Sequence, residues 1–140
     1  MCISGTRGAS GGIVARFNHR TGRGCWWCFQ AGLDHTIPSP HADAAGDVQP
    51  AGCGRLTYVG ANFDMMEVAI QGVRLAVATL LARRGGGNDF EWDVAVVNLT
   101  DARGNRTEPR WSVYTVDPDP NCPVCKKEDA ASFLVGWRAR

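Results

Sequence analysis

The chain has 140 residues, a mass of 15.1 kDa, 44% hydrophobic residues and a formal net charge of +1. This size suits one domain with a hydrophobic core, and the near-neutral charge gives no reason to expect nucleic acid or a membrane as a partner. The N-terminal sequence MCISGTRGASGG lacks an apolar stretch of signal-peptide length. We therefore expect a cytoplasmic, reducing location, in which six cysteines favour metal or thiol chemistry over disulfides.

The first predicted elements are two short strands, over residues 2–4 and 13–17, joined by a glycine-rich turn. Alternation places Ile13, Ala15 and Phe17 on one face of the second strand. The glycines of this turn do not have the Gly-x-Gly-x-x-Gly spacing of a nucleotide loop. They are also followed by a strand, where a phosphate loop needs a helix N-terminus. A hairpin turn is the better interpretation.

Two Cys-x-x-Cys pairs are the strongest chemical signal in the chain. They are Cys25-Trp-Trp-Cys28 and Cys122-Pro-Val-Cys125, and each places two thiols on one tight turn. Together they provide four sulfur ligands, a closed set for Zn²⁺ with no open coordination position. We therefore predict a structural zinc site at Cys25, Cys28, Cys122 and Cys125. The alternative interpretations are four reduced core thiols and, for the second pair, a redox site, which normally needs a preceding strand and a following helix.

Residues 31–55 show no periodicity and predict one long flexible loop, rich in Pro, Asp, Gly and Ala. The loop contains His35, His41 and Asp43, which could be taken as a metal site. Nothing in the sequence fixes their geometry, so solvated loop residues are the simpler interpretation. The loop also contains a lone cysteine, Cys53, between two glycines.

Residues 62–81 predict a helix, with Asn62 as its N-cap and the glycine run 85–87 as its stop. Apolar residues surround nearly the whole helix, so we expect a helix buried at the centre of the fold. Residues 92–99 predict a strand inside the sheet, and a turn over 101–106 joins it to a strand over 111–116. The tail 130–140 predicts a strand or a helical turn.

In chain order, these elements resemble the C-terminal half of the ThiF/MoeB family, the relatives of ubiquitin-activating enzymes. The stretches that carry the resemblance are CISGTRGASGGIVARF, GRGCWWCF, AGCGRLTYVGANFDMMEVAIQGVRLAVATLLA and VDPDPNCPVCKK, within about residues 2–127. The paired cysteine motifs and the aspartate-rich approach to the second pair are its most specific parts.

The resemblance implies an α/β fold, the C-terminal half of a Rossmann-like adenylating domain. It implies a mixed sheet, a central buried helix, a β-hairpin and a structural zinc site formed by the two cysteine pairs. Members of the family bind ATP and Mg²⁺, often as homodimers. They activate the C-terminal glycine of a ubiquitin-like or sulfur-carrier protein as an acyl-adenylate. Cys53 lies near the position of the cysteine that, in many members, takes the acyl group or carries sulfur to it.

The family's nucleotide loop and its ATP- and Mg²⁺-contacting residues all precede the strand that corresponds to residues 2–4. We therefore expect a partial domain over 1–140, which would need an N-terminal half or a homodimer partner and would activate nothing alone. The alternative from another class is a non-catalytic, zinc-stabilised protein-binding module that needs no ATP. A companion chain that restores ATP-dependent chemistry would distinguish the two.

Overall fold

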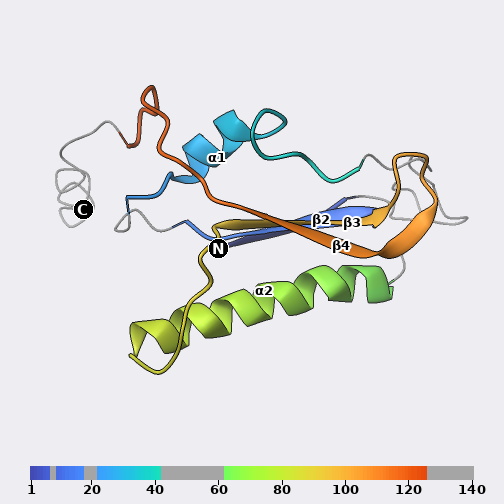
Figure 1. The fold of residues 1–140 in the computed structure, drawn as a ribbon, viewed down its shortest axis with the longest axis horizontal. Helices are drawn as coiled ribbons and strands as arrows, with labels where there is room; N and C mark the ends of the chain where they lie inside the picture. Colours follow the sequence, from blue (N-terminus) through green and yellow to red (C-terminus); the bar gives the residue numbers. More distant parts are fainter. Residues whose placement is uncertain (7–8, 18–21, 42–61, 126–140) are drawn as a thin grey trace, which may run out of the picture.

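A computed structural model describes residues 1–6, 9–17, 22–41 and 62–125. Within these ranges the chain forms three layers, with a short helix on one face of a four-stranded sheet and a long helix on the other (Figure 1). The elements are β1 (Cys2–Gly5), β2 (Gly11–Ala15), α1 (Trp26–Gly32), α2 (Asn62–Arg83), β3 (Val94–Thr100) and β4 (Arg106–Tyr114). The predicted tail 130–140 lies outside the described residues.

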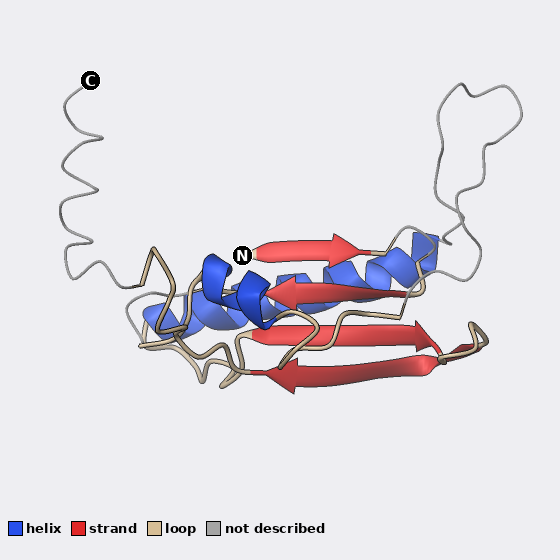
Figure 2. Cartoon of the chain, turned by 90° about the horizontal axis from the view of Figure 1, so that it is seen from above, coloured by secondary structure: helices blue, strands red, loops and turns tan. Residues whose placement is uncertain are grey.

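The sheet has the strand order β1-β2-β3-β4, and every described pair of neighbours is antiparallel (Figure 2). The expected mixed sheet is therefore wrong for the described strands. The two predicted hairpins are confirmed, because β1 pairs with β2 and β3 pairs with β4. The interior position of β3 is confirmed as well, and β4 begins earlier than expected, at Arg106.

The central strand β3 supplies both hydrophobic cores because its side chains alternate between the two faces of the sheet. Val94 and Val96 join the core under α1, whereas Val97 and Leu99 join the core under α2. All four of these side chains are buried. This explains why β3 has almost no polar position, as expected for a strand covered on both faces.

The predicted helix is present as α2, but it is not buried at the centre of the fold. It covers β1 and β2 on one face of the sheet, and within α2 only Asp64, Val68, Gly72 and Leu75 are buried among the side chains described. Most of its large apolar side chains are exposed, which corrects the expectation of a helix covered on nearly all sides. By length and composition alone, α2 would also be long and apolar enough to cross a membrane, a property shared by core helices of soluble proteins.

Small residues and polar contacts explain why α2 presents its less apolar side to the sheet. A side chain at Gly72 would collide with Ile3 of β1, so glycine allows the backbones to approach closely. Asp64 forms an ion pair with Arg106 of β4, and Glu67 accepts a hydrogen bond of 3.0 Å from the Trp111 indole nitrogen. These two carboxylates of the helix are therefore paired with the sheet, which reduces the penalty of burying them.

The predicted helix stop is confirmed by a Schellman arrangement after Arg83. Gly86 donates its N–H to the Leu81 carbonyl, and Gly85 donates to the Ala82 carbonyl. Gly85 has a φ of 72°, in the left-handed region that glycine adopts without steric cost.

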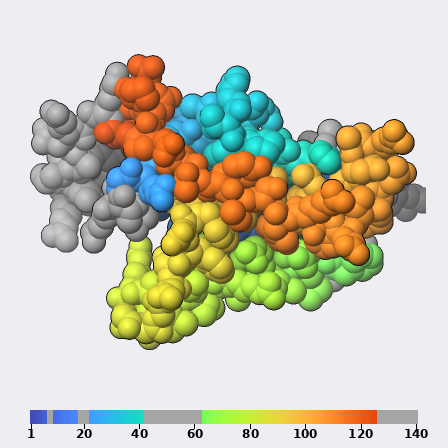
Figure 3. Space-filling model, in the orientation of Figure 1, coloured from blue at the N-terminus to red at the C-terminus, as the bar shows by residue number. Residues whose placement is uncertain are grey.

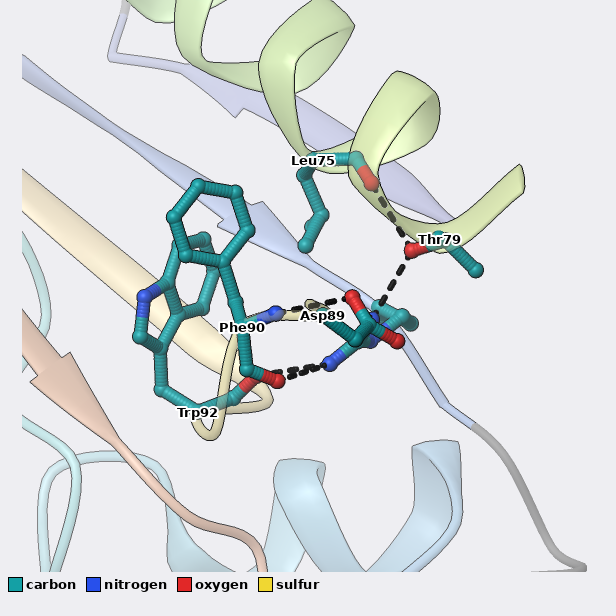
Figure 4. Close-up of polar contacts among 6 residues, drawn as sticks. Leu75, Thr79, Asp89, Phe90 and Trp92 are labelled. Atoms are coloured by element: carbon teal, nitrogen blue, oxygen red, sulfur yellow. Dashed lines mark hydrogen bonds and ion pairs between the residues drawn. The ribbon is translucent and has the colours of Figure 1, made fainter. Parts of the chain in front are cut away.

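Arg16, just after β2, joins the C-terminal half of α2 to the segment that leads into β3. Figure 4 shows its partners Thr79, Asp89, Phe90 and Trp92. Its guanidinium donates to Thr79 Oγ1 of α2 at 2.8 Å and to the Phe90 carbonyl at 2.8 Å. It also forms an ion pair with Asp89 and donates to the Trp92 carbonyl. Arg16 is only 15% exposed in its side chain, so solvent screens these contacts weakly.

We expect Arg16→Met to lower the free energy of unfolding by about 1–3 kcal/mol, because methionine keeps much of the aliphatic stem but leaves several partly buried acceptors without their donor. Arg110→Met on β4 is the matched control. Arg110 is exposed and makes no polar contact with the part of the chain that the structure describes, so its replacement should change stability by less than about 0.5 kcal/mol. Urea unfolding of the two variants would measure both values, and equal effects would show that the Arg16 contacts contribute little.

Candidate metal centre

The two Cys-x-x-Cys pairs meet at one end of the sheet, on the face that carries α1. Cys25 Sγ lies 3.8 Å from Cys28 Sγ and 3.5 Å from Cys122 Sγ, and Cys28 Sγ lies 3.5 Å from Cys125 Sγ. All four sulfurs lie within 4.8 Å of one another. We call these four residues the cysteine cluster.

The geometry of the cysteine cluster fits a tetrahedral ion. An ion bonded to four thiolates at about 2.3 Å holds the sulfurs about 3.8 Å apart, close to the three separations just given. A disulfide would need about 2.05 Å, and all four cysteines are free thiols. Cys25, Cys28 and Cys122 are buried, and Cys125 is partly exposed. The predicted meeting of the two pairs is thus confirmed, and the group could hold a metal ion.

The first cysteine pair lies at the start of a helix, not on an isolated turn followed by a loop. Cys25 is the N-cap residue of α1, and its side chain makes no capping hydrogen bond, so Sγ is free to point into the cluster. Cys28 lies in the first turn of α1 and is buried. The predicted loop 31–55 therefore begins later than expected, after Gly32, and its residues 42–55 lie outside the described part of the chain.

Backbone N–H groups of the second pair's loop point at the sulfurs. Asp119 donates its N–H to Cys28 Sγ at 3.3 Å, and Cys125 donates to Cys122 Sγ at 3.4 Å. Such bonds favour the thiolate form that a metal ion requires. The bond from Asp119 also links the two cysteine pairs, because Asp119 lies in the segment before Cys122 and its N–H points at the sulfur of Cys28.

Two residues that the sequence did not single out, Gly24 and Asp93, hold the backbone at Val116, in the segment between β4 and the second cysteine pair. Gly24 donates its N–H to the Val116 carbonyl at 2.6 Å, and a side chain at this position would lie 2.6 Å from the Asp117 carbonyl oxygen. Asp93 is buried and accepts the N–H of Val116 at 2.9 Å through its carboxylate. The glycine directly before Cys25 was a visible signal for the first contact. The second contact had no sequence signal.

Aromatic side chains pack beside the cluster and help to exclude water. Phe17, Trp26 and Phe29 form a triangle with ring centroids 5.3–5.6 Å apart. Phe29 belongs to the same buried core as Cys25, Cys28 and Cys122. A dry surrounding strengthens the electrostatic attraction between thiolates and a cation.

Without a metal, the thiols of the cluster differ widely in pKa. Burial raises the pKa of the Cys125 thiol to about 12, with a further contribution from Cys28, and burial also raises the pKa of Cys25. Burial opposes ionisation of Cys122 too, but the N–H groups of Cys125 and Val124 outweigh it and lower its pKa to about 7. One thiol of the group is thus partly ionised at neutral pH, while two others keep their protons until a cation displaces them.

Neither His35 nor His41, the other candidates within the described residues, belongs to the cysteine cluster. His41 lies near the far end of β3, where its Nδ1 is 2.7 Å from the Thr100 carbonyl oxygen. Cys53 and Asp43 lie outside the described residues. The Cys122–Cys125 pair lies in turns without a strand before it, so the structural setting expected for a redox pair is missing there.

Two longer proteins of Sinorhizobium fredii are similar to this chain. The uncharacterized protein y4oA is 36% identical over 118 residues, and the uncharacterized protein y4qC is 35% identical over 91 residues. These matches cover 84% and 61% of the chain but only 19% and 14% of the relatives. The chain therefore spans less than a fifth of the proteins it matches. No protein-family model matches the chain, and no solved structure matches it significantly.

The affinity of the cluster for a metal ion is expected to fall as the pH is lowered. Metal binding requires thiolates, and each thiol that must lose a proton costs about a factor of ten in affinity per pH unit. Cys25 and Cys125, whose pKa values are raised, together predict a loss of about 100-fold or more between pH 8 and pH 7. Competition with a chelator of known affinity at several pH values would measure this slope. An affinity that does not change with pH would show that these thiols are not ligands.

Proposed function

We propose that the cysteine cluster is a structural Zn²⁺ site. The observation that carries this proposal is the convergence of four thiol sulfurs within 4.8 Å, three of them on buried residues. An all-sulfur set suits Zn²⁺ and leaves no coordination position for a water or a substrate. The bound ion would hold the start of α1 against the segment after β4, and so join two parts of the chain that are far apart in the sequence.

On this basis we infer that the chain is the zinc-bearing half of a ThiF/MoeB-type activating domain. The order of the described elements supports this reading: a strand hairpin, a cysteine pair at the start of a short helix, a long helix, a second hairpin and a second cysteine pair. The similar stretches in two much longer proteins agree with a segment that works within a larger protein. In this role the chain would provide a scaffold and a docking surface for a ubiquitin-like or sulfur-carrier protein, while ATP and Mg²⁺ would be bound elsewhere.

A binding measurement tests the docking role. The zinc-loaded chain should bind a ubiquitin-like carrier protein that ends in glycine, as measured by calorimetry. It should lose this binding after removal of zinc. A chelated sample and a Cys28→Ser variant provide the metal-free states, and a carrier protein that lacks its last residues is the control ligand. No binding by the zinc-loaded chain to a panel of such carriers would contradict this role, while leaving the metal site intact.

A zinc-stabilised binding module without any link to ATP is the second candidate. It is favoured by the closed, buried character of the cluster, which offers no reactive group to a substrate. Pyrophosphate exchange distinguishes the two candidates. Neither predicts exchange by the chain alone, but the ThiF/MoeB reading requires exchange when a nucleotide-binding half and a carrier protein are added. Exchange that appears in the mixture and disappears with Cys28→Ser would favour the half-domain.

A further inference from the structure

The cysteine cluster is reached from solvent at one of its four residues. Cys25, Cys28 and Cys122 are only 2–5% exposed, whereas Cys125 is partly exposed. Cys125 lies in the segment after β4, which packs beside α1 at one end of the molecule (Figure 3, orange-red beside light blue). A small reactive molecule that approaches the cluster therefore meets Cys125 first.

The four sulfurs form two close pairs, and each pair crosses between the two motifs. Cys28 Sγ lies 3.5 Å from Cys125 Sγ, and Cys25 Sγ lies 3.5 Å from Cys122 Sγ. The separation within the first motif, from Cys25 Sγ to Cys28 Sγ, is larger, at 3.8 Å. Each crossing pair joins residues that are 97 positions apart in the chain. A disulfide at either pair would therefore make the same connection as a metal ion in the cluster.

We propose that hydrogen peroxide oxidises the zinc-loaded cluster from Cys125, releases the ion, and leaves the disulfides Cys28–Cys125 and Cys25–Cys122 in its place. This inference rests on the structural Zn²⁺ site proposed above and adds a regulation of that site. Intracellular cysteines that respond to oxidants are accessible thiolates with a second cysteine close by. Cys125 and Cys28 have this arrangement, and their disulfide would join the two motifs rather than close one of them.

The reaction takes two steps at the first pair and consumes one peroxide. A sulfur bound to Zn²⁺ is a thiolate, which is the nucleophilic form. The Cys125 thiolate attacks one oxygen of the peroxide. An S–O bond forms, the O–O bond breaks, and hydroxide leaves, which gives a sulfenic acid. The Cys28 thiolate then attacks this sulfur, the S–S bond forms, and a second hydroxide leaves. Two electrons pass from the two sulfurs to the peroxide, and protons from solvent convert both hydroxides to water.

Oxidation of the first pair removes two of the four ligands, so the ion leaves as a hydrated cation. Cys25 and Cys122 then lie 3.5 Å apart, and a second peroxide oxidises them by the same two steps. The oxidised chain no longer needs a metal, because two crosslinks between residues 97 positions apart limit the unfolded chain strongly. A thiol reductant followed by Zn²⁺ restores the original state.

Stepwise oxidation of the zinc-loaded chain with hydrogen peroxide tests the proposal. Metal analysis before the oxidant is added shows whether each chain holds one ion, and a colorimetric chelator then reports zinc release. We expect two peroxides to release one ion and to consume four of the six thiols. Peptide mapping should find the two crossing disulfides, and a reagent that traps sulfenic acids should label Cys125 first. The oxidised, metal-free chain should still unfold cooperatively on heating, whereas the reduced, chelated chain should not.

Cys125→His and Cys122→His are a matched pair of variants. Each keeps four ligands, because three cysteines and one histidine also form structural zinc sites. Cys125→His removes the accessible sulfur, so peroxide should release its zinc at least about tenfold more slowly. Cys122→His keeps both Cys125 and Cys28, so its zinc should leave at about the wild-type rate, with the single disulfide Cys28–Cys125. If either variant does not hold zinc, the peptide map of the wild-type chain decides.

Several results would overturn the proposal while leaving the zinc site in place. They are an ion that stays bound in excess peroxide, disulfides within the two motifs, sulfenic acid trapped first at a buried cysteine, and an oxidised chain that is unfolded. Equal release rates in the two histidine variants would overturn it as well. A purified chain without zinc would instead contradict the site itself, and this inference with it.

Discussion

Replacing Cys28 with serine is expected to release the metal ion and to abolish the cooperative thermal unfolding of the chain. Cys28 is buried, its sulfur lies 3.5–3.8 Å from two others of the cluster, and it accepts the N–H of Asp119. Structural Zn²⁺ sites bind with about 10–16 kcal/mol of apparent free energy in small domains. A single domain has a stability of only about 5–15 kcal/mol. The free energy lost when the ion is released is therefore comparable to the whole stability of the domain.

Metal analysis of the purified variant and a thermal scan would measure both effects. Cys2→Ser is the matched control, because Cys2 is a free thiol on β1 outside the cluster. It should keep one metal ion per chain and most of the melting temperature. A Cys28→Ser protein that retains its metal and its melting temperature would exclude a structural site. Loss of metal without loss of stability would show that the ion is bound but does not support the fold.

Gly12→Val is expected to lower the free energy of unfolding by about 3 kcal/mol or more. Gly12 lies in β2 under α2, and a Cβ atom there would lie 2.6 Å from Val68 Cγ2 and 2.9 Å from the Ser4 carbonyl oxygen. The first contact would force α2 away from the sheet, and the second would strain the pairing of β1 with β2. Overpacking of this kind usually costs about 1–3 kcal/mol for small insertions, and valine adds more than one group.

A double variant separates the two contacts. Gly12→Ala together with Val68→Ala makes room on the helix, so the cost of the pair should be smaller than the sum of the single costs. The control is Gly22→Ala, where no other described residue has an atom within 4 Å of the added Cβ, although its φ of 69° adds some strain. Chemical unfolding would give all four values. Additive costs for the pair would mean that α2 does not rest on Gly12.

For the glycine-rich N-terminal segment, the sequence correctly predicted a hairpin but not the contact of Gly12 with α2. Its spacing excluded a nucleotide loop, and the β1–β2 hairpin agrees with that exclusion. No local pattern indicated that Gly12 would contact Val68 of a helix that begins fifty residues later. Such a contact depends on how two distant elements approach each other, which no local pattern encodes.

Which side of α2 packs against the sheet is the clearest feature that could not be predicted from the sequence. Its hydrophobic residues extend around most of the helix, so burial on any side was compatible with the pattern. The three-dimensional structure presents the side with Val68 and Gly72 to the sheet, because small residues and the pairing of Asp64 with Arg106 allow close contact there. The opposite side, which carries most of the large apolar side chains of the helix, is left exposed as a result.

Local chemistry, in contrast, determined the strands, the helix and its stop, and the two cysteine pairs. Alternation fixes a strand, a Gly85 at positive φ ends a helix, and Cys-x-x-Cys spacing holds two sulfurs together, all within a few residues. Only the tertiary structure decided that the described strands are all antiparallel and that the Asp93 carboxylate holds the segment that leads to the second cysteine pair. These features join residues far apart in the chain, and the free energy that selects them comes from packing and desolvation of the assembled layers.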